Sequence, residues 1–238
     1  MLKNSKGLLK LVVLAMLVAL GVVISPLLRF EGMCPMAHFI NILCSVLLGP
    51  WYSLLCATLI GIIRMIFMAI PPIALTGAIF GAFLSGVFYR VSKGNLLMAV
   101  LGEIIGTGII GAVLSYPVMT IFWGRTDLNW VFYVPSFICG TLIGGSIAYV
   151  FLRKIAKAEV LEDFQKKLSS VSYGYKGSLI GDAATVCGLG VIAFLVIEIL
   201  SGIFKFELSY ISWTALIVFI AFGIATYIRG KKNEVKNG

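Results

Sequence analysis

Three polar side chains stand in otherwise apolar runs near the start of the chain. His38 and Asn41 open one apolar run, and Arg64 lies near the end of the next. The triplet Gly49-Pro50-Trp51 separates the two runs and predicts a tight break between two helices. Folding at this break brings Arg64 to about the same depth as His38 and Asn41, so the three side chains are expected to converge.

These residue types suit the binding of a small molecule. Histidine and asparagine can donate and accept hydrogen bonds, whereas arginine only donates. An arginine in hydrocarbon costs about 2.5–3.5 kcal/mol, so a function is the default hypothesis for it. The set fits a small heteroaromatic ring with a hydroxyl or anionic group. Two alternatives stay open: Arg64 ties backbone carbonyls at a helix end, and His38 is a satisfied interface histidine.

Glu103 is a second polar group within an apolar run. It lies about 10 Å above the predicted inner start of its helix, which is too deep for a pair with Arg64 unless that helix tilts. Thr107 follows one turn later on the same face and extends a polar stripe towards Tyr116. Ligand contact and hydrogen bonding between helices are both open roles for Glu103.

Two aromatic residues, Trp130 and Tyr133, flank a polar loop. They predict either an aromatic belt at the membrane interface or stacking walls for a flat ligand. The chain has one histidine, and its five cysteines show no Cys-x-x-Cys spacing. No metal site, cofactor or disulfide framework is therefore expected.

Composition defines the class of protein. The chain is 60% hydrophobic and only 12% charged, in continuous runs of helix length. Runs of about 20 apolar residues match helices that cross a core of about 30 Å. The sequence predicts an all-α integral membrane protein. The net charge of +9 does not indicate nucleic acid, because most Lys and Arg lie in loops and tails and no basic patch carries interleaved aromatics.

Eight helices are expected. An uncleaved first helix ending near Leu28 is favoured over a signal peptide, because its apolar run is long and no cleavage site is clear. The helix near 37–49 is short for a span. The predicted ranges after the first helix are 37–49, 50–69, 72–89, 95–122, 131–152, 179–203 and 209–228.

The distribution of Lys and Arg predicts the topology. One set of loops and both tails carry many cations, whereas the alternate loops carry only Arg29, Arg125 and Lys205. Cytoplasmic loops are the ones enriched in Lys and Arg. Both termini are therefore expected in the cytoplasm of a multi-pass cell-membrane protein, with His38 and Asn41 near the outside.

The charged segment 153–178 divides the chain. Residues 1–152 form a predicted six-helix body, and residues 179–238 form a two-helix tail. Within the segment, apolar residues recur at helical spacing and predict an amphipathic helix on the inner membrane surface, with a solvated linker as the alternative. These residues are Ile155, Ala158, Leu161, Phe164 and Leu168. Asp182 and Glu198 are further acids in the tail without an assigned role beyond helix pairing.

Glycine pairs four residues apart recur on three successive helices. They are Gly77/Gly81, Gly102/Gly106 and Gly140/Gly144. Small residues at this spacing let helix backbones approach closely. The three helices are expected to pack as a tight unit.

Three stretches resemble the ThiW family. They are residues 38–64, with His38, Asn41, Gly49-Pro50-Trp51-Tyr52 and Arg64; GAIFGAFLSGVFYR at 77–90; and GEIIGTGIIGAVLSYPV at 102–118. The resemblance covers about residues 8–152. ThiW proteins are substrate-binding S components of energy-coupling factor (ECF) transporters and are assigned to the thiazole moiety of thiamin.

The resemblance implies a vitamin-precursor importer subunit. Such a subunit binds hydroxyethylthiazole from outside and docks on a transmembrane coupling protein with two ATPases. S components typically carry Ala-x-x-x-Ala on helix 1 for that docking, and here the pair is Ala15 and Ala19. Together with the residue types and depths described above, this predicts a substrate site made of His38, Asn41, Arg64, Glu103, Thr107, Tyr116, Trp130 and Tyr133.

Other functions remain as alternatives. The ligand can be another small vitamin-like ring, such as hydroxymethylpyrimidine, and the protein can be a stand-alone secondary transporter. The latter would need inverted repeats and broken helices, and no convincing repeat is present. An enzyme is not expected, because one histidine excludes His-Glu-x-x-His and the nearest serine candidate, Ser146, lies on the opposite side from His38.

Overall fold

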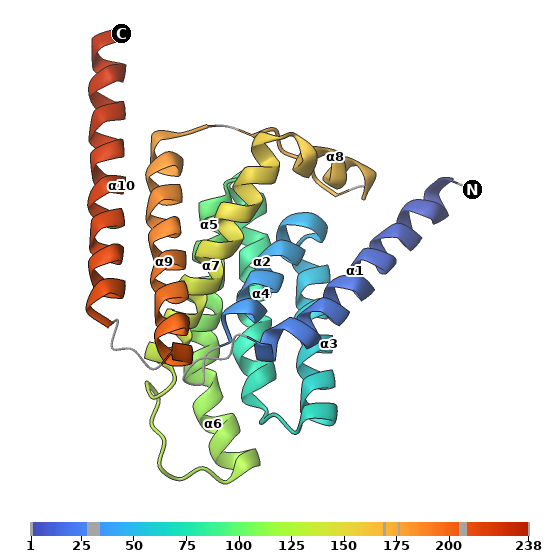
Figure 1. Cartoon of the computed structure of the whole chain (residues 1–238). Helices are drawn as coiled ribbons and strands as arrows, with labels where there is room; N and C mark the ends of the chain where they lie inside the picture. The colour runs from blue at the N-terminus through green and yellow to red at the C-terminus, as the bar shows by residue number, and fades with distance from the viewer. Residues whose placement is uncertain (1, 28–33, 169, 176, 205–208, 238) are drawn as a thin grey trace.

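The computed structural model describes residues 2–27, 34–168, 170–175, 177–204 and 209–237, which are helical apart from turns and connections (Figure 1). The helices are α1 (Leu2–Leu27), α2 (Pro35–Leu48), α3 (Pro50–Met68), α4 (Ile73–Val91), α5 (Leu96–Glu103), the π-helical segment η1 (Ile104–Gly111), α6 (Ala112–Trp123), α7 (Val134–Lys157), α8 (Val160–Lys167), α9 (Leu179–Phe204) and α10 (Ser209–Asn237). Arg29, Lys176 and Lys205, used above for topology or the linker, lie outside the described residues.

Within the described residues, seven helices are long and apolar enough to cross a membrane, with α5, η1 and α6 forming one continuous span from Leu96 to Trp123. The shorter α2 has 14 residues. At about 1.5 Å per residue it spans only about 21 Å. The predicted all-α integral membrane protein is thus confirmed, and the short second helix is observed.

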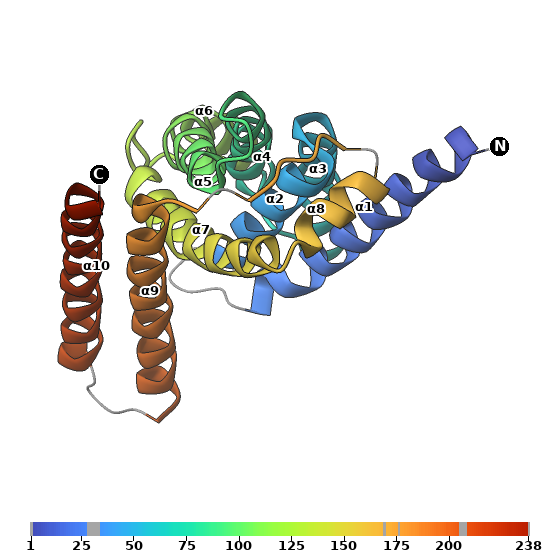
Figure 2. The same ribbon diagram turned by 90° about the horizontal axis from the view of Figure 1, so that it is seen from above.

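Both described ends of the chain and α8 lie at one end of the molecule (Figure 1). We call this the α8 end. The connections 69–72 and 124–133 lie at the opposite end. Viewed from above, α9 and α10 stand on one side of the bundle and α1 on the other (Figure 2). This same-side arrangement of the ends agrees with an even number of membrane passes.

The break between α2 and α3 forms at the predicted triplet. Gly49 has φ +93°, a left-handed conformation that favours glycine, and its N–H donates to Ser45 O. Pro50 then begins α3, where its missing N–H leaves no hydrogen bond unmade. The chain therefore reverses without a loop, and the end of α3 returns to the start of α2.

Glycines set the separation between α4 and the span that starts with α5. A Cβ added at Gly102 would lie 2.5 Å from Leu84 O, and one at Gly106 would lie 2.5 Å from Phe80 O. No side chain of any size fits between these backbones. The tight packing predicted from the glycine pairs is confirmed between these two spans. Gly144, in the third pair, lies instead against α2, where an added Cβ would lie 2.9 Å from His38 Cβ.

The charged segment is helical in two pieces rather than one. The helix expected to end at residue 152 continues to Lys157, and Glu159 at φ +62° then separates α7 from α8. Because of this break, Ala158 and Phe164 are exposed, whereas Leu161 and Leu168 are buried. The amphipathic helix is therefore α8, with a narrower apolar face than the continuous pattern suggested.

Candidate functional site

A small cavity of about 70 Å³ lies at the end opposite α8. The starts of α2, α4 and α7 and the end of α3 surround it. Its polar walls come from His38 and Arg64, and its aromatic wall is Phe137. The remaining lining residues are Cys34, Ala37, Ile70, Ile73, Ala74, Gly77, Ala78 and Ser136. We call this the α2–α3 cavity.

Arg64 brings a buried guanidinium to this cavity. The residue is 4% exposed, and its Nη2 donates to Cys34 Sγ over 3.6 Å. The side-chain Nε is buried without a partner among the described residues. A buried donor without an acceptor costs about 1–3 kcal/mol, so this arrangement favours a site that an acceptor completes.

His38 joins the cavity to a polar cluster deeper in the bundle. Its Nδ1 lies 2.9 Å from Glu103 Oε1. The same oxygen accepts from Asn41 Nδ2 at 3.0 Å and from Thr107 Oγ1 at 3.1 Å. All four residues are buried, and Asn41 Nδ2 also donates to Ala78 O at 3.3 Å. Hydrogen bonds of Glu103 therefore link α2 to η1, and Asn41 extends this network to α4.

The second oxygen of Glu103 stands against a glycine. Oε2 is buried without a hydrogen-bond partner among the described residues. A Cβ added at Gly81 would lie 2.8 Å from it and would overlap Thr107 Oγ1. Glycine at position 81 thus makes room for the carboxyl group, which explains why the packing of α4 and the polar cluster depend on each other.

The contact with Glu103 determines what His38 offers to a ligand. Because Glu103 occupies Nδ1, Nε2 is the ring nitrogen left for the cavity. If the carboxylate accepts the Nδ1 proton, a neutral imidazole presents Nε2 as an acceptor, and a protonated one presents a second donor. The site can therefore hold a ligand hydroxyl with His38 and a ligand acceptor with Arg64.

A π-helix begins directly after Glu103. It runs over Ile104–Gly111 and contains Thr107. Such segments are rare and are frequent at functional sites, because the widened turn shifts side chains relative to a regular helix. Here the π-helix and its glycines lie against α4 and α7. The π-helix therefore lies at the polar cluster, where it packs against these two helices.

The structure brings together some of the residues expected at the site and separates others. His38 and Arg64 line the cavity, and Asn41, Glu103 and Thr107 lie behind His38. Tyr133 does not line the cavity, but it contacts the lining residue Phe137, with the two ring centroids 5.8 Å apart.

Tyr116 and Trp130 lie outside the cavity lining. Their rings pair with each other, with centroids 4.8 Å apart. Trp130 is 57% exposed.

Sequence reasoning missed several lining residues. The most informative of them is Phe137, whose ring packs against Gly77. A Cβ added at Gly77 would lie 2.7 Å from that ring. The glycine pair on α4 was visible, but nothing in the sequence said which aromatic residue would fill the space. Cys34 and Ser136 were also missed, since each precedes or begins a helix without a motif around it.

No group of three or more metal-ligating side chains occurs among the described residues. In the 124–133 connection, the pKa of Asp127 is lowered to about 2, chiefly by hydrogen bonds from Arg125. Both side chains are exposed, and Arg125 Nε and Nη2 donate to the two carboxylate oxygens at 2.7 and 2.6 Å. This pair belongs to the surface of the 124–133 connection.

The chain was compared with known proteins. The profile described as "Thiamine-precursor transporter protein (ThiW)" matches residues 11–158, from α1 to the end of α7. Comparison with curated proteins and with solved structures gave no match. The matched range includes every residue of the α2–α3 cavity and of the cluster around Glu103. The chain therefore belongs to the ThiW family of thiamine-precursor transporter proteins.

Proposed function

We propose that the protein is the substrate-binding S component of an ECF importer and that it binds hydroxyethylthiazole in the α2–α3 cavity. The observation that carries this proposal is the pairing of Arg64, with its unpartnered Nε, and His38, held by Glu103, on one small cavity. Arg64 donates to the thiazole nitrogen, and Nε2 of His38 binds the hydroxyl of the side chain.

The other walls suit the flat ring. Phe137 provides an aromatic face, and Ile70, Ile73 and Ala74 provide apolar contacts. Mostly apolar pockets with a few placed polar groups are typical of small-molecule sites. The volume of the cavity, about 70 Å³, is smaller than that of a substituted thiazole. Binding is therefore expected to move the 69–72 connection at its mouth.

The α1 surface supports docking on a coupling protein. Ala15 and Ala19 are exposed and line an apolar groove of about 530 Å³ with Leu59 and Ile63 of α3. Small residues let a partner helix approach closely. The proposed partner is the transmembrane coupling protein of the ECF module, whose two ATPases supply the energy.

The ligand assignment is tested by thermal unfolding of the purified protein. Hydroxyethylthiazole, hydroxymethylpyrimidine and thiamin are added in parallel. A ligand at 100 times its Kd stabilises the folded state by about 2.7 kcal/mol. Stabilisation by hydroxyethylthiazole, lost in His38→Gln, is the expected result. Stabilisation by the pyrimidine alone would assign a different ring to the same site, and the thiazole proposal would be wrong.

Coupling is tested by uptake. Cells that contain the ECF module should import the ligand, and Ala15→Leu with Ala19→Leu should abolish uptake while leaving ligand binding intact. The matched control is Met16→Leu, which changes an exposed residue of the same helix outside the groove. Uptake without the module would instead indicate a stand-alone secondary transporter.

A further inference from the structure

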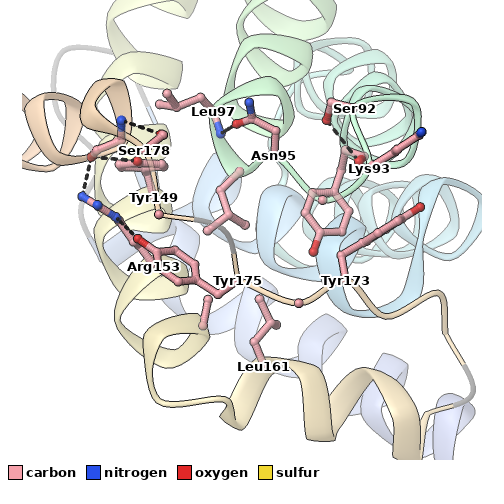
Figure 3. A pocket seen from close by; sticks show the side chains of 17 residues that line it. Ser92, Lys93, Asn95, Leu97, Tyr149, Arg153, Leu161, Tyr173, Tyr175 and Ser178 are labelled. Carbon is pink, nitrogen blue, oxygen red and sulfur yellow. Dashed lines mark hydrogen bonds between the residues drawn. The ribbon is translucent and has the colours of Figure 1, made fainter. Parts of the chain in front are cut away.

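A second cavity lies at the α8 end and is larger than the α2–α3 cavity, at about 230 Å³ (Figure 3). Three parts of the chain surround it: the turn between α4 and α5, the last turns of α7, and the connection from α8 to α9. Figure 2 shows this connection crossing the end of the bundle. The cavity shares no residue with the α2–α3 cavity. We call it the α8-end cavity.

Cations line this cavity on opposite sides, and its described lining includes no acidic residue. Arg153 and Lys93 stand on the two sides in Figure 3. Arg153 is 4% exposed and is paired with Asp182, which neutralises much of its charge. Lys93 has no ion pair among the described residues. Lys93, whose side chain extends outward in Figure 3, thus carries an uncompensated positive charge at the rim.

Hydroxyl groups in the wall present donors without acceptors. Tyr89, which is 2% exposed, accepts from Gln165 Nε2 at 3.1 Å. Tyr175 accepts from Arg153 Nε at 2.9 Å, and Ser178 Oγ accepts from Gly181 N at 3.0 Å. Among the described residues, none of these three hydroxyls has an acceptor for its own proton. Each can therefore donate to a ligand.

The two helix ends beside the cavity are both N-termini, so their partial charges are both positive. The first residues of α5, Leu96 and Leu97, lie in the wall, and Ser178 immediately precedes α9. Helix N-termini carry partial positive charge and favour anions. Unassigned donors, an unpaired lysine and two helix N-termini all favour a ligand that is anionic and rich in acceptors.

We propose that the α8-end cavity binds a phosphate group. Phosphate oxygens accept several hydrogen bonds, and their negative charge can pair with Lys93, which has no ion pair among the described residues. The group can belong to an anionic lipid, because the cavity lies at the end of the spanning helices beside the amphipathic α8, or to a free phosphate ester. Phenol rings from Tyr89, Tyr149, Tyr173 and Tyr175 supply apolar wall for the remainder of either ligand.

The test uses the full-length protein and two probes. Native mass spectrometry measures binding of phosphatidylglycerol against phosphatidylcholine, and thermal unfolding measures stabilisation by inorganic phosphate against chloride at equal ionic strength. The variant is Lys93→Gln with Tyr175→Phe, which removes one charge and one hydroxyl group. It also removes the acceptor for Arg153 Nε but keeps the ion pair of Arg153 with Asp182. The control is Lys154→Gln, an exposed cation at the same end that does not line the cavity.

Two results support the proposal. Preferential phosphatidylglycerol binding that weakens about tenfold in the double variant identifies a lipid headgroup, and stabilisation by phosphate that the double variant loses identifies a free phosphate ester. Equal behaviour of wild type, double variant and control with both probes would overturn it. Stabilisation by hydroxyethylthiazole is measured in the same variants and should not change. This separates the outcome from that of the proposed transport function.

Discussion

At the scale of single residues, Glu103 connects the wall of the α2–α3 cavity to the bundle. One carboxylate oxygen holds His38, Asn41 and Thr107, and the other lies against Gly81. Buried polar networks of this kind are stable when complete and costly when one member is removed. The same residue therefore orients His38 in the wall of the α2–α3 cavity and joins α2 to η1.

Glu103→Ala should lower the free energy of unfolding by about 3 kcal/mol, because it leaves the polar groups of His38, Asn41 and Thr107 buried without their shared acceptor. Glu103→Gln keeps one acceptor oxygen and should lose less than half of that. Chemical denaturation in detergent measures both. Equal stability of Glu103→Ala and wild type would contradict the network described here.

Gly81→Ala should destabilise the protein by about 1–3 kcal/mol, because the new methyl group overlaps Thr107 and approaches Glu103 Oε2. It should also weaken ligand binding through displacement of Glu103 and His38. Gly7→Ala is the control, since nothing lies within 4 Å of a Cβ there. Thermal unfolding with and without hydroxyethylthiazole reports both effects, and a Gly81→Ala protein that matches the control would refute the close packing.

At the scale of elements, the lengths of the helices explain what the sequence could predict. Hydropathy defined the spans, and Gly49-Pro50-Trp51 defined the reversal that places His38 near Arg64. The contact of His38 with Glu103 was not predicted, because His38 was expected in the outer turns of its helix and Glu103 near the inner start of its own. With α2 ending at Leu48, Asn41 lies about 10 Å from the α8 end, as does Glu103 in its own span.

That comparison of depths needed only the two helix boundaries. The pairing with Phe137 could not be found in this way, because it depends on how α7 turns about its own axis relative to Gly77. The break at Glu159 was also hidden, since the apolar spacing continues across it. Periodicity locates faces of helices, but it does not report where one helix stops and another starts.

The amphipathic α8 is fastened to the bundle by one buried side chain. Gln165 Nε2 donates to Val46 O at 2.9 Å and to Tyr89 Oη at 3.1 Å. Gln165→Ala should release α8 and increase amide hydrogen exchange over residues 160–167, with little change in α3. Glu162→Gln, which removes only an exposed pair with Lys166, is the control. Unchanged exchange in Gln165→Ala would show that α8 is held by its leucines alone.

At the scale of the whole molecule, the two-helix tail is joined to the body by Arg153. This residue hydrogen-bonds Gly181 O, Thr185 and Asp182 on α9, and α9 in turn carries α10. The α2–α3 cavity is lined by α2, α3, α4 and α7 and the connections beside them, and by no residue of the described part of the tail. The proposed substrate site and the attachment of the tail therefore lie at opposite ends of the same bundle.

The predicted orientation places Asp127 outside the cell and Lys232 inside it. In a cysteine-free background, an impermeant maleimide applied to intact cells should label Asp127→Cys and spare Lys232→Cys until the membrane is opened. Both positions are exposed in the structure. Labelling of Lys232→Cys in intact cells would reverse the topology and would put the α2–α3 cavity on the cytoplasmic side.

The central claim is that Arg64 and His38 together bind the thiazole precursor in the α2–α3 cavity. Isothermal titration of hydroxyethylthiazole into purified wild type, Arg64→Gln and Arg125→Gln tests this binding. Arg125→Gln is the control, because Arg125 lies at the same end of the molecule but is already paired with Asp127. The affinity of Arg64→Gln should be at least about tenfold weaker, as expected for loss of a charged hydrogen bond, and that of Arg125→Gln should not change. Equal affinities in all three proteins would contradict it.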